Sequence, residues 1–207
     1  AAVPGRKWEF GLSLWNAAFA LSRQLCEQRT ALAMGAFADG RAVIEMGCGQ
    51  ALVSMVVAEL FPRLRRIVAT DGSEDVLHSA RANVSANLGG PGHGLDLTPL
   101  RWGHPDHLRR ALDLNDGSAY DVVLAADVTY MEDCSDLVSS MLELSHSSTE
   151  VWITHEPRRR SVEGLEACLR AGFRAVTTFE VELTEQDTGR NERIPILGWH
   201  CVGRAQH

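Results

Sequence analysis

The sequence predicts an α/β fold: a Rossmann-like, doubly wound and mostly parallel sheet of seven strands with an antiparallel C-terminal hairpin. Three observations support this prediction. Short apolar runs alternate with helical segments, a glycine-containing loop follows the first apolar run, and two strand-like segments close the chain with no helix between them. Alternating strands and helices are typical of a parallel sheet that helices cover on both faces.

Five apolar runs are predicted to be the parallel strands, at residues 42–45, 66–70, 96–100, 122–126 and 151–155. Helical segments are expected at residues 50–61, 74–88, 105–112, 133–144 and 161–171. Ser73 is expected to cap the second of these helices, with two acids in the first turn. Gly172 is expected to end the last helix in a left-handed conformation.

The last two predicted strands, at 175–183 and 196–202, are joined by the polar run 184–193. They are therefore expected to pair antiparallel at the edge of the sheet. No repeat or linker divides the sequence, so we expect one domain over residues 1–207, with an N-terminal helical segment at 1–40 and a core at 41–207. The glycine-rich stretch 88–95 is expected to be the most flexible loop.

The composition argues against a general nucleic-acid binder. The 207 residues carry a formal net charge of -7, whereas phosphate binding needs a basic surface. Such a balance suits a small molecule or a basic peptide. No apolar run reaches the roughly 18 residues of a membrane helix, so we expect no membrane association.

The five cysteines are odd in number, widely spaced and without a C-x-x-C pair. This pattern predicts neither a disulfide framework nor a zinc cluster. It favours a reducing compartment, the cytoplasm or alternatively the nucleus. His104 and His107 form a pair near a helix start, but no third and fourth ligand follows at a recognisable spacing, so we expect a surface loop and no metal site.

The run Glu45-Met46-Gly47-Cys48-Gly49 lies between the first predicted strand and the first long helix. Glycines there let the backbone turn sharply and approach a ligand. Asp71 ends the next strand, 26 residues after Glu45 (71 − 45). That separation is near the roughly 20 residues expected for an acid that binds ribose hydroxyls. The alternative interpretation of the loop is a simple tight turn, and the alternative interpretation of Asp71 is a helix cap.

Two cofactors use such a loop. A dinucleotide enzyme needs a small residue at the third position of G-x-G-x-x-G, where this chain has Leu52. This bulky residue disfavours a pyrophosphate and with it a nicotinamide-dependent dehydrogenase. Glu45, just before the glycines, instead suits a ligand with a cationic amino-acid end.

Six short motifs then occur in order across nearly the whole chain. They are Leu14-Trp15-Asn16-Ala17-Ala18, Ile44-Glu45-Met46-Gly47-Cys48-Gly49, Thr70-Asp71, Asn83-Val84-Ser85-Ala86-Asn87, Leu100-Arg101-Trp102-Gly103 and Ala125-Ala126-Asp127-Val128-Thr129-Tyr130. In this order they resemble the seven-strand (class I) S-adenosylmethionine-dependent methyltransferases. More narrowly, the chain resembles the methyltransferase-like protein-lysine N-methyltransferases.

This resemblance implies that S-adenosylmethionine is the cofactor. Gly47 and Gly49 would pass under its methionine part, Glu45 would help to order the loop, and Asp71 would hold the ribose. The third glycine that the family often has is Ala51 in this chain. Because alanine takes little more room than glycine, we expect binding to survive.

The remaining cofactor residues follow from the same motifs. Trp102 would lie against the adenine and Trp15 would cover the cofactor from the N-terminal segment, with ordinary packing as the alternative for both. Cys48 and Ala126 belong to the predicted cofactor site. Cys48 lies near a helix N-terminus that would lower the pKa of its thiol, but we expect it to pack rather than to react.

The resemblance places Asp127-Val128-Thr129-Tyr130 at the methyl-transfer site, at the carboxyl end of a buried-looking strand. Asp127 would hold a substrate lysine amine or its developing charge. Tyr130 would offer a hydroxyl or a ring face. The alternative is a strand-end acid that caps the next helix. After the fifth strand, Arg158 matches the family's arginine only loosely, and we expect a solvated turn there.

The implied function is methylation of a lysine side chain in a protein substrate by direct displacement, in a protein that is a monomer rather than an obligate oligomer. Three alternatives stay open. The acceptor is a small amine or pyridine, it is another protein side chain such as histidine or arginine, or the chain is a non-catalytic S-adenosylmethionine-binding module.

Overall fold

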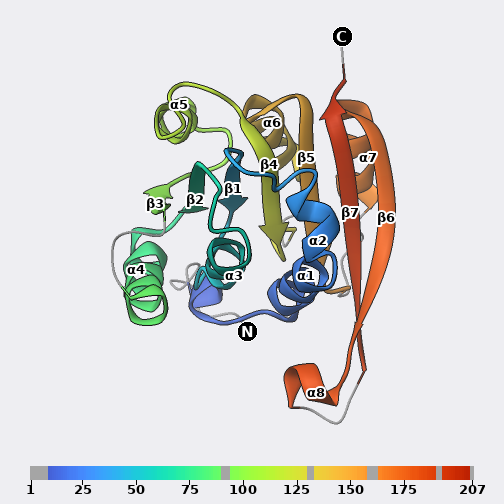
Figure 1. Ribbon diagram of the computed structural model, residues 1–207. Helices are drawn as coiled ribbons and strands as arrows, with labels where there is room; N and C mark the ends of the chain where they lie inside the picture. Colours follow the sequence, from blue (N-terminus) through green and yellow to red (C-terminus); the bar gives the residue numbers. More distant parts are fainter. Residues whose placement is uncertain (1–8, 90–93, 130–132, 158–162, 190–192, 206–207) are drawn as a thin grey trace, which may run out of the picture.

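A seven-stranded sheet forms the centre of the computed structural model, with the strand order β3-β2-β1-β4-β5-β7-β6 (Figure 1). The structure describes residues 9–89, 94–129, 133–157, 163–189 and 193–205. The strands are β1 (Ala42–Met46), β2 (Arg66–Asp71), β3 (Leu95–Pro99), β4 (Tyr120–Ala126), β5 (Ser145–His155), β6 (Phe173–Leu183) and β7 (Ile194–Arg204). β1 to β5 run parallel, and β7 runs antiparallel to both β5 and β6. The predicted fold class is confirmed.

Helices cover both faces of this sheet (Figure 1). They are the 3-10 helix η1 (Glu9–Leu12) and the α-helices α1 (Asn16–Glu27), α2 (Arg29–Ala33), α3 (Leu52–Leu60), α4 (Glu74–Leu88), α5 (Pro105–Asp113), α6 (Ser135–Glu143), α7 (Glu163–Gly172) and α8 (Glu185–Thr188). α1 to α4 pack on one face, and α5 to α7 pack on the other. The division at residue 40 into a helical segment and a core stays a prediction.

Two apolar cores follow from the alternation of side chains along the central strands. On β1, Ile44 joins the core under α5, α6 and α7, whereas Val43 joins the core under α1, α2 and α3. On β4, Val123 and Leu124 divide in the same way. Every residue of β1 is buried, as expected for a parallel strand covered on both faces. This double packing fixes the carboxyl ends of β1 and β4, where the candidate site lies.

Two predicted helix signals have different outcomes. Ser73 caps α4 as expected, because its hydroxyl accepts a hydrogen bond from the Val76 amide at 3.5 Å. The prediction for Gly172 is wrong: it is the last residue of α7 and does not have a left-handed backbone. A Cβ there would lie 2.8 Å from Cδ1 of Leu142, so the glycine allows α7 to pack closely on α6.

The terminal hairpin differs from the prediction in its connection. β6 and β7 pair antiparallel over ten register positions from Phe173↔Arg204 to Leu183↔Ile194, but the polar run between them contains the short helix α8. Thr184 and Asp187 form a capping box there, and Asp187 also accepts a hydrogen bond from Arg23 of α1 at 2.9 Å. The hairpin is thus fastened to the helix that precedes the sheet.

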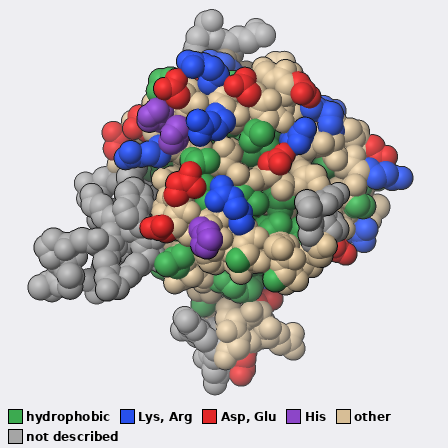
Figure 2. Space-filling view, turned by 90° about the vertical axis from the view of Figure 1, so that its left-hand side faces the viewer, with side chains coloured by type: hydrophobic (Ala, Val, Ile, Leu, Met, Phe, Trp, Pro, Cys, Tyr) green, Lys and Arg blue, Asp and Glu red, His purple; other side chains and the backbone are tan. Residues whose placement is uncertain are grey.

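Acidic and basic side chains are interspersed on the face that carries β3, α4 and α5 (Figure 2). Among the described residues, no helix is long and apolar enough to cross a bilayer. Residues 90–93 of the glycine-rich stretch 88–95, together with Tyr130 and Arg158, lie outside the described residues.

Candidate active site

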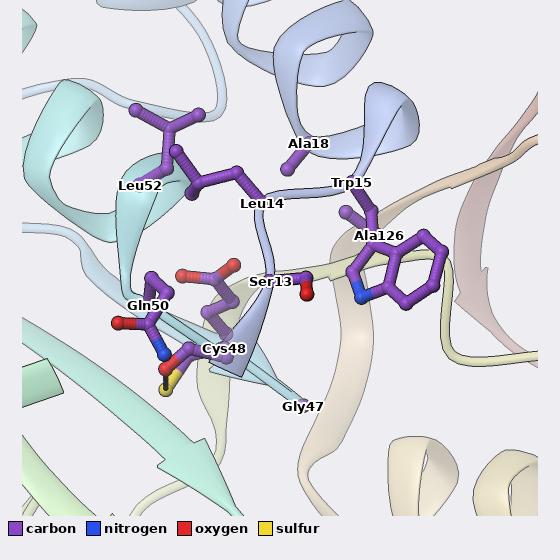
Figure 3. Close-up of a pocket in the computed structure, with 11 residues that line it drawn as sticks. Ser13, Leu14, Trp15, Ala18, Gly47, Cys48, Gln50, Leu52 and Ala126 are labelled. Carbon is purple, nitrogen blue, oxygen red and sulfur yellow. Dashed lines mark hydrogen bonds between the residues drawn. The ribbon is translucent and has the colours of Figure 1, made fainter. Parts of the chain in front are cut away.

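A pocket lies at the carboxyl ends of β1 and β4, where the order of strands along the chain reverses. Open α/β sheets bind ligands at this kind of switch point. The space at its mouth and within it, open solvent included, is about 310 Å³. The lining residues come from the segment before α1 and the first turns of α1, from β1 and the loop after it, from the start of α3 and from the end of β4: Ser13, Leu14, Trp15, Ala18, Glu45, Gly47, Cys48, Gly49, Gln50, Leu52 and Ala126 (Figure 3).

The loop after β1 is built from left-handed residues. Gly47 has φ +68°, and a Cβ there would lie 2.7 Å from Val128 Cγ1 and 3.6 Å from Trp102 Cζ2. Gly49 has φ +53°, and its Cβ would lie 3.3 Å from the Gly11 carbonyl oxygen. Both positions therefore require glycine, for their backbone and for close contacts within the protein.

Ala51 shares this left-handed backbone, with φ 63° at the N-terminal cap of α3. Sequence reasoning predicted that alanine would fit because of its size. Its left-handed conformation was not predicted, and such a conformation costs an L-residue about 1–2 kcal/mol. The methyl group is fully buried beside Leu77 and Ala80, and this packing offsets part of the cost.

Glu45, the last but one residue of β1, is a buried acid that is 2% exposed. Its Oε2 accepts hydrogen bonds from the Ser54 amide, at 2.9 Å, and from the Ser54 hydroxyl. Burial raises the pKa of Glu45 to about 7 even though both hydrogen bonds lower it. Because Ser54 belongs to α3, this contact joins the strand before the loop to the helix after it. That geometry supports the predicted loop-ordering role.

Asp71, at the end of β2, faces the same loop from the other side. Its Oδ2 accepts a hydrogen bond from the Gly49 amide at 3.2 Å, and its Oδ1 accepts one from the Ser73 amide at 3.0 Å. Burial raises its pKa, against the effect of these amides. Asp71 is not among the described lining residues of the pocket, but it positions one of them directly.

Cys48, within the loop, belongs to the apolar cluster that contains Leu77 and Ala80 of α4 and is 6% exposed. Burial raises the pKa of its thiol well above the usual value, and the charges of Glu45 and Asp71 act in the same direction. The lowering expected from the nearby helix N-terminus is therefore wrong. A protonated thiol agrees with packing and not with nucleophilic chemistry.

Residues 13–15, which we call the strap, form the pocket wall that precedes α1. Leu14 points toward Leu52, and Trp15 lies on the side of Ala126 (Figure 3). The strap is fixed at both flanks: the Gln50 side chain donates to the Gly11 carbonyl at 2.7 Å, and the Asn16 side chain donates to Glu156 at 3.0 Å.

Gln50 also ties the loop to α4. Its side-chain oxygen accepts hydrogen bonds from the Ser79 hydroxyl and from the side-chain amide of Asn83, both at 2.8 Å. The sequence motif that contains Asn83 therefore contacts the loop through Gln50, a residue to which sequence reasoning assigned no role.

Asp127 follows β4 in a left-handed conformation, with φ 57°. Its amide donates to the Thr154 carbonyl at 2.8 Å, and its side chain is only 3% exposed. Asp127 Oδ1 lies 3.3 Å from Nδ1 of His155, a buried residue that ends β5. The same nitrogen lies 2.7 Å from the Thr129 hydroxyl. The structure thus brings Asp127 together with two residues that sequence reasoning did not select.

His104 and His107 stack with ring centroids 4.3 Å apart at the start of α5. The Arg101 amide donates to Nδ1 of His107 at 3.0 Å, and burial with the neighbouring positive charges lowers the pKa of His107. Within the described part of the chain, no group of three or more histidine, cysteine or acidic side chains is placed to hold a metal ion.

The fold and the loop geometry define a class I methyltransferase. A family model described as lysine methyltransferase matches residues 5–165. The chain therefore belongs to the lysine methyltransferase family, which confirms the resemblance stated from the motifs and excludes the dehydrogenase alternative.

Two curated relatives have related names. The chain is 29% identical over 168 residues to protein-lysine N-methyltransferase EFM3 of Chaetomium thermophilum, covering 79% of this chain and 48% of that protein. It is 32% identical over 136 residues to protein N-lysine methyltransferase METTL21A of Danio rerio, covering 65% of this chain and 58% of that protein. The chain thus spans about half the length of these relatives.

Solved structures share the fold at low sequence identity. A magnesium protoporphyrin IX methyltransferase from Synechocystis, crystallised with bound S-adenosylmethionine, has a TM-score of 0.60 at 17% identity over 94% of this chain and 89% of that chain. A precorrin-6y C5,15-methyltransferase from Geobacter metallireducens has a TM-score of 0.57 at 16% identity over 86% and 88%. Such similarities support the fold.

Proposed function

We propose that this protein transfers the methyl group of S-adenosylmethionine to a lysine side chain of a protein substrate. The observation that carries the proposal is the buried, left-handed Asp127 at the end of β4, one residue before Val128, which packs on Gly47 of the loop. A residue held in an unfavourable backbone conformation is typical of functional sites. Family membership and the names of the curated relatives support the acceptor class.

The residues of the pocket fit S-adenosylmethionine. The loop turns at Gly47 and Gly49 without side chains, Glu45 supplies a carboxyl group on the lining, and Asp71 stands at the end of the next strand. These groups suit the ammonium end and the ribose hydroxyls of the cofactor. Leu14 and Leu52 add apolar surface.

The other predicted contacts belong to the same proposal. Trp102, beside Gly47, is assigned to the adenine, and Trp15 and Ala126, which line the pocket, are assigned to the cofactor as well, with Trp15 covering it from the N-terminal segment. Cys48 is assigned a packing role beneath the cofactor. Tyr130 is assigned to the acceptor lysine on the basis of its motif, because it lies outside the described residues.

The bound cofactor supplies a methyl group already activated on a sulfonium, so the protein mainly has to position the reactants and exclude water. Asp127 holds the acceptor nitrogen and stabilises its developing positive charge. It is a poor base for lysine, since the ordinary pKa values of the two side chains are roughly 3.9 and 10.4. The amine loses its proton to water before it enters the site, helped by desolvation.

We further propose a cytoplasmic location, with the nucleus as the alternative, and a monomeric state. All five cysteines are free thiols, as suits a reducing compartment. The net charge of -7 suits a basic segment of a protein acceptor better than nucleic acid.

Calorimetric titration with S-adenosylmethionine and separately with NAD tests the cofactor assignment. Saturable binding of S-adenosylmethionine alone is expected, and failure to bind it would defeat the proposal. Incubation with cell extract and methyl-tritiated S-adenosylmethionine, followed by mass spectrometry of the labelled species, tests the acceptor. We expect a labelled peptide that carries a methylated lysine. If the tritium label is found only on small amines, or on histidine or arginine side chains, the proposed lysine acceptor is wrong, whereas the proposed cofactor is not affected.

A further inference from the structure

His155 is a polar residue inside the fold that the reaction described above does not use. It ends β5, pairs with Leu197 of β7 and is 3% exposed. Its Nδ1 lies 2.7 Å from Oγ1 of Thr129 and 3.3 Å from Oδ1 of Asp127. One ring nitrogen therefore faces both the motif aspartate and the residue two positions after it.

The two oxygens together determine where the ring proton lies. A hydroxyl oxygen either donates or accepts, whereas a carboxylate oxygen only accepts. If Nδ1 carried a lone pair, it would accept from the Thr129 hydroxyl, but it would also face the buried Asp127 carboxylate as one acceptor against another. If Nδ1 carries the proton, it donates to both oxygens. The geometry therefore favours the Nδ1–H form of His155, whether the ring is neutral or charged.

This contact acts on a residue with a left-handed backbone. Asp127 has φ 57°, and its amide is already fixed by the Thr154 carbonyl at 2.8 Å. Thr154 is the residue before His155, so β5 contacts Asp127 through both its backbone and its side chain. The Thr154 hydroxyl in turn donates to the Ala17 carbonyl of α1 at 2.8 Å. The end of β5 thus holds Asp127 while being held by the helix that follows the strap.

We propose that His155 is a positioning residue for methyl transfer: its Nδ1–H, shared between Thr129 and Asp127, fixes the plane of the Asp127 carboxylate for the acceptor amine. This rests on the proposed function of Asp127. It does not place His155 in contact with either substrate. The consequence for kinetics is a loss in kcat with little change in cofactor affinity, since the group acts only through Asp127.

The proton position is measurable without any acceptor. Long-range ¹H–¹⁵N correlation spectra of the protein labelled at histidine report which ring nitrogen is protonated, and His155→Asn assigns the signal. We expect a protonated Nδ1 in the unmodified protein. A protonated Nε2 with a bare Nδ1 would overturn the proposal and would leave the proposed methyltransferase function untouched.

The kinetic test compares two substitutions at one site. His155→Asn keeps an N–H donor near the position of Nδ1, whereas His155→Leu removes it. Using tritium transfer from S-adenosylmethionine into cell-extract protein, we expect His155→Leu to slow transfer about 10- to 100-fold. We expect His155→Asn to restore most of the rate, and the S-adenosylmethionine Kd to change less than about two-fold in both. Equal losses in the two variants would overturn the proposal.

A matched control and a coupled variant complete the design. His200 also contacts a carboxylate, Glu150, at 2.7 Å, but on β7 and β5 away from the pocket, so His200→Leu should leave transfer unchanged. In an Asp127→Ala background, which removes the acceptor on which His155 is proposed to act, His155→Leu should slow transfer no further. A further loss there of about ten-fold would show that His155 acts independently of Asp127, contrary to the proposal.

Discussion

The Gly49 amide donates a hydrogen bond of 3.2 Å to Oδ2 of Asp71, so the loop after β1 is fastened to the acid that ends β2. The second carboxylate oxygen accepts from the Ser73 amide at 3.0 Å, at the cap of α4. Asp71 therefore fixes the backbone just before α3 and at the N-terminal cap of α4. Asp71 thus has a structural role in addition to the proposed contact with the ribose. A substitution of Asp71 has to be tested for its effect on stability and, separately, for its effect on cofactor binding.

We predict that Asp71→Ala weakens S-adenosylmethionine binding at least about ten-fold and destabilises the fold by about 1–3 kcal/mol, because two amides lose a charged acceptor. Calorimetry and urea denaturation measure the two effects. Asp96→Ala is the matched control: this acid lies on the neighbouring strand and pairs with Arg66 at 2.7 Å, away from the loop. Unchanged cofactor affinity in Asp71→Ala would contradict the assignment.

Gly47→Ala is predicted to destabilise the protein more than Gly40→Ala. Both glycines are left-handed, with φ +68° and +78°, so both substitutions cost about 1–2 kcal/mol for the backbone. Only at Gly47 would the new methyl meet a neighbour, Val128, at 2.7 Å, whereas nothing lies within 4 Å at Gly40. Overpacking should add about 1–3 kcal/mol, measurable by urea denaturation. Equal losses of stability in the two variants would show that Val128 moves away from the new methyl group at little cost.

Glu45→Gln is predicted to change how stability depends on pH. Because the pKa of Glu45 is raised from 4.5 to about 7 on folding, the wild-type contribution is fully present below pH 4.5 and is lost as pH rises through 7. Glutamine does not ionise. The unfolding free energy of the variant relative to wild type should therefore rise by up to about 3 kcal/mol between roughly pH 5 and 8.5.

Denaturation of the cofactor-free protein across this pH range measures the effect. Glu166→Gln is a suitable control, since the Arg170 hydrogen bond lowers the pKa of Glu166 and its ionisation is largely complete at the acidic end of the range. The stability difference for that variant should stay constant. A constant difference for Glu45→Gln as well would show that Glu45 ionises normally.

Asp127→Ala is predicted to keep most of the cofactor affinity and to lose most of the turnover, by at least about 100-fold, because transition-state charge loses its partner. Asp127→Asn tests the charge alone, since asparagine tolerates the left-handed backbone. Asp116→Asn is the control, at an exposed aspartate with φ 54°. Turnover is measured by tritium transfer into protein. Unimpaired turnover of the alanine variant would remove Asp127 from the mechanism.

The sequence was sufficient for the central strands because their burial is continuous. β1 and β4 lie between two layers of helices, so their apolar runs stand out in the chain and their boundaries are close to those predicted. β5 was predicted to begin at Val151 but begins at Ser145. Its first residues are polar, and the Thr149 hydroxyl donates to the Tyr120 carbonyl at 2.6 Å, beside a register shift. Such local side-chain bonding leaves no apolar pattern in the sequence.

Residues of the candidate site could be predicted only where they belong to a sequence motif. Asp71 and Asp127 occupy strand ends next to recognisable sequence. His155 and Gln50 were not selected, because their partners lie far along the chain: Asp127 is 28 residues from His155 (155 − 127), and Gly11 is 39 from Gln50. A useful signal was available for His155. Since β4 and β5 are parallel neighbours, polar residues that end both strands are expected to meet.

The strap has a consequence for ligand linkage. Its residues wall the pocket, while its flanks are joined to the loop through Gln50 and to the end of β5 through Glu156. A ligand seated there contacts the sheet and the N-terminal layer together, so its binding free energy couples the two. The local stability of η1 and α1 therefore becomes a function of ligand concentration. Opening of that layer and release of the ligand are then thermodynamically coupled.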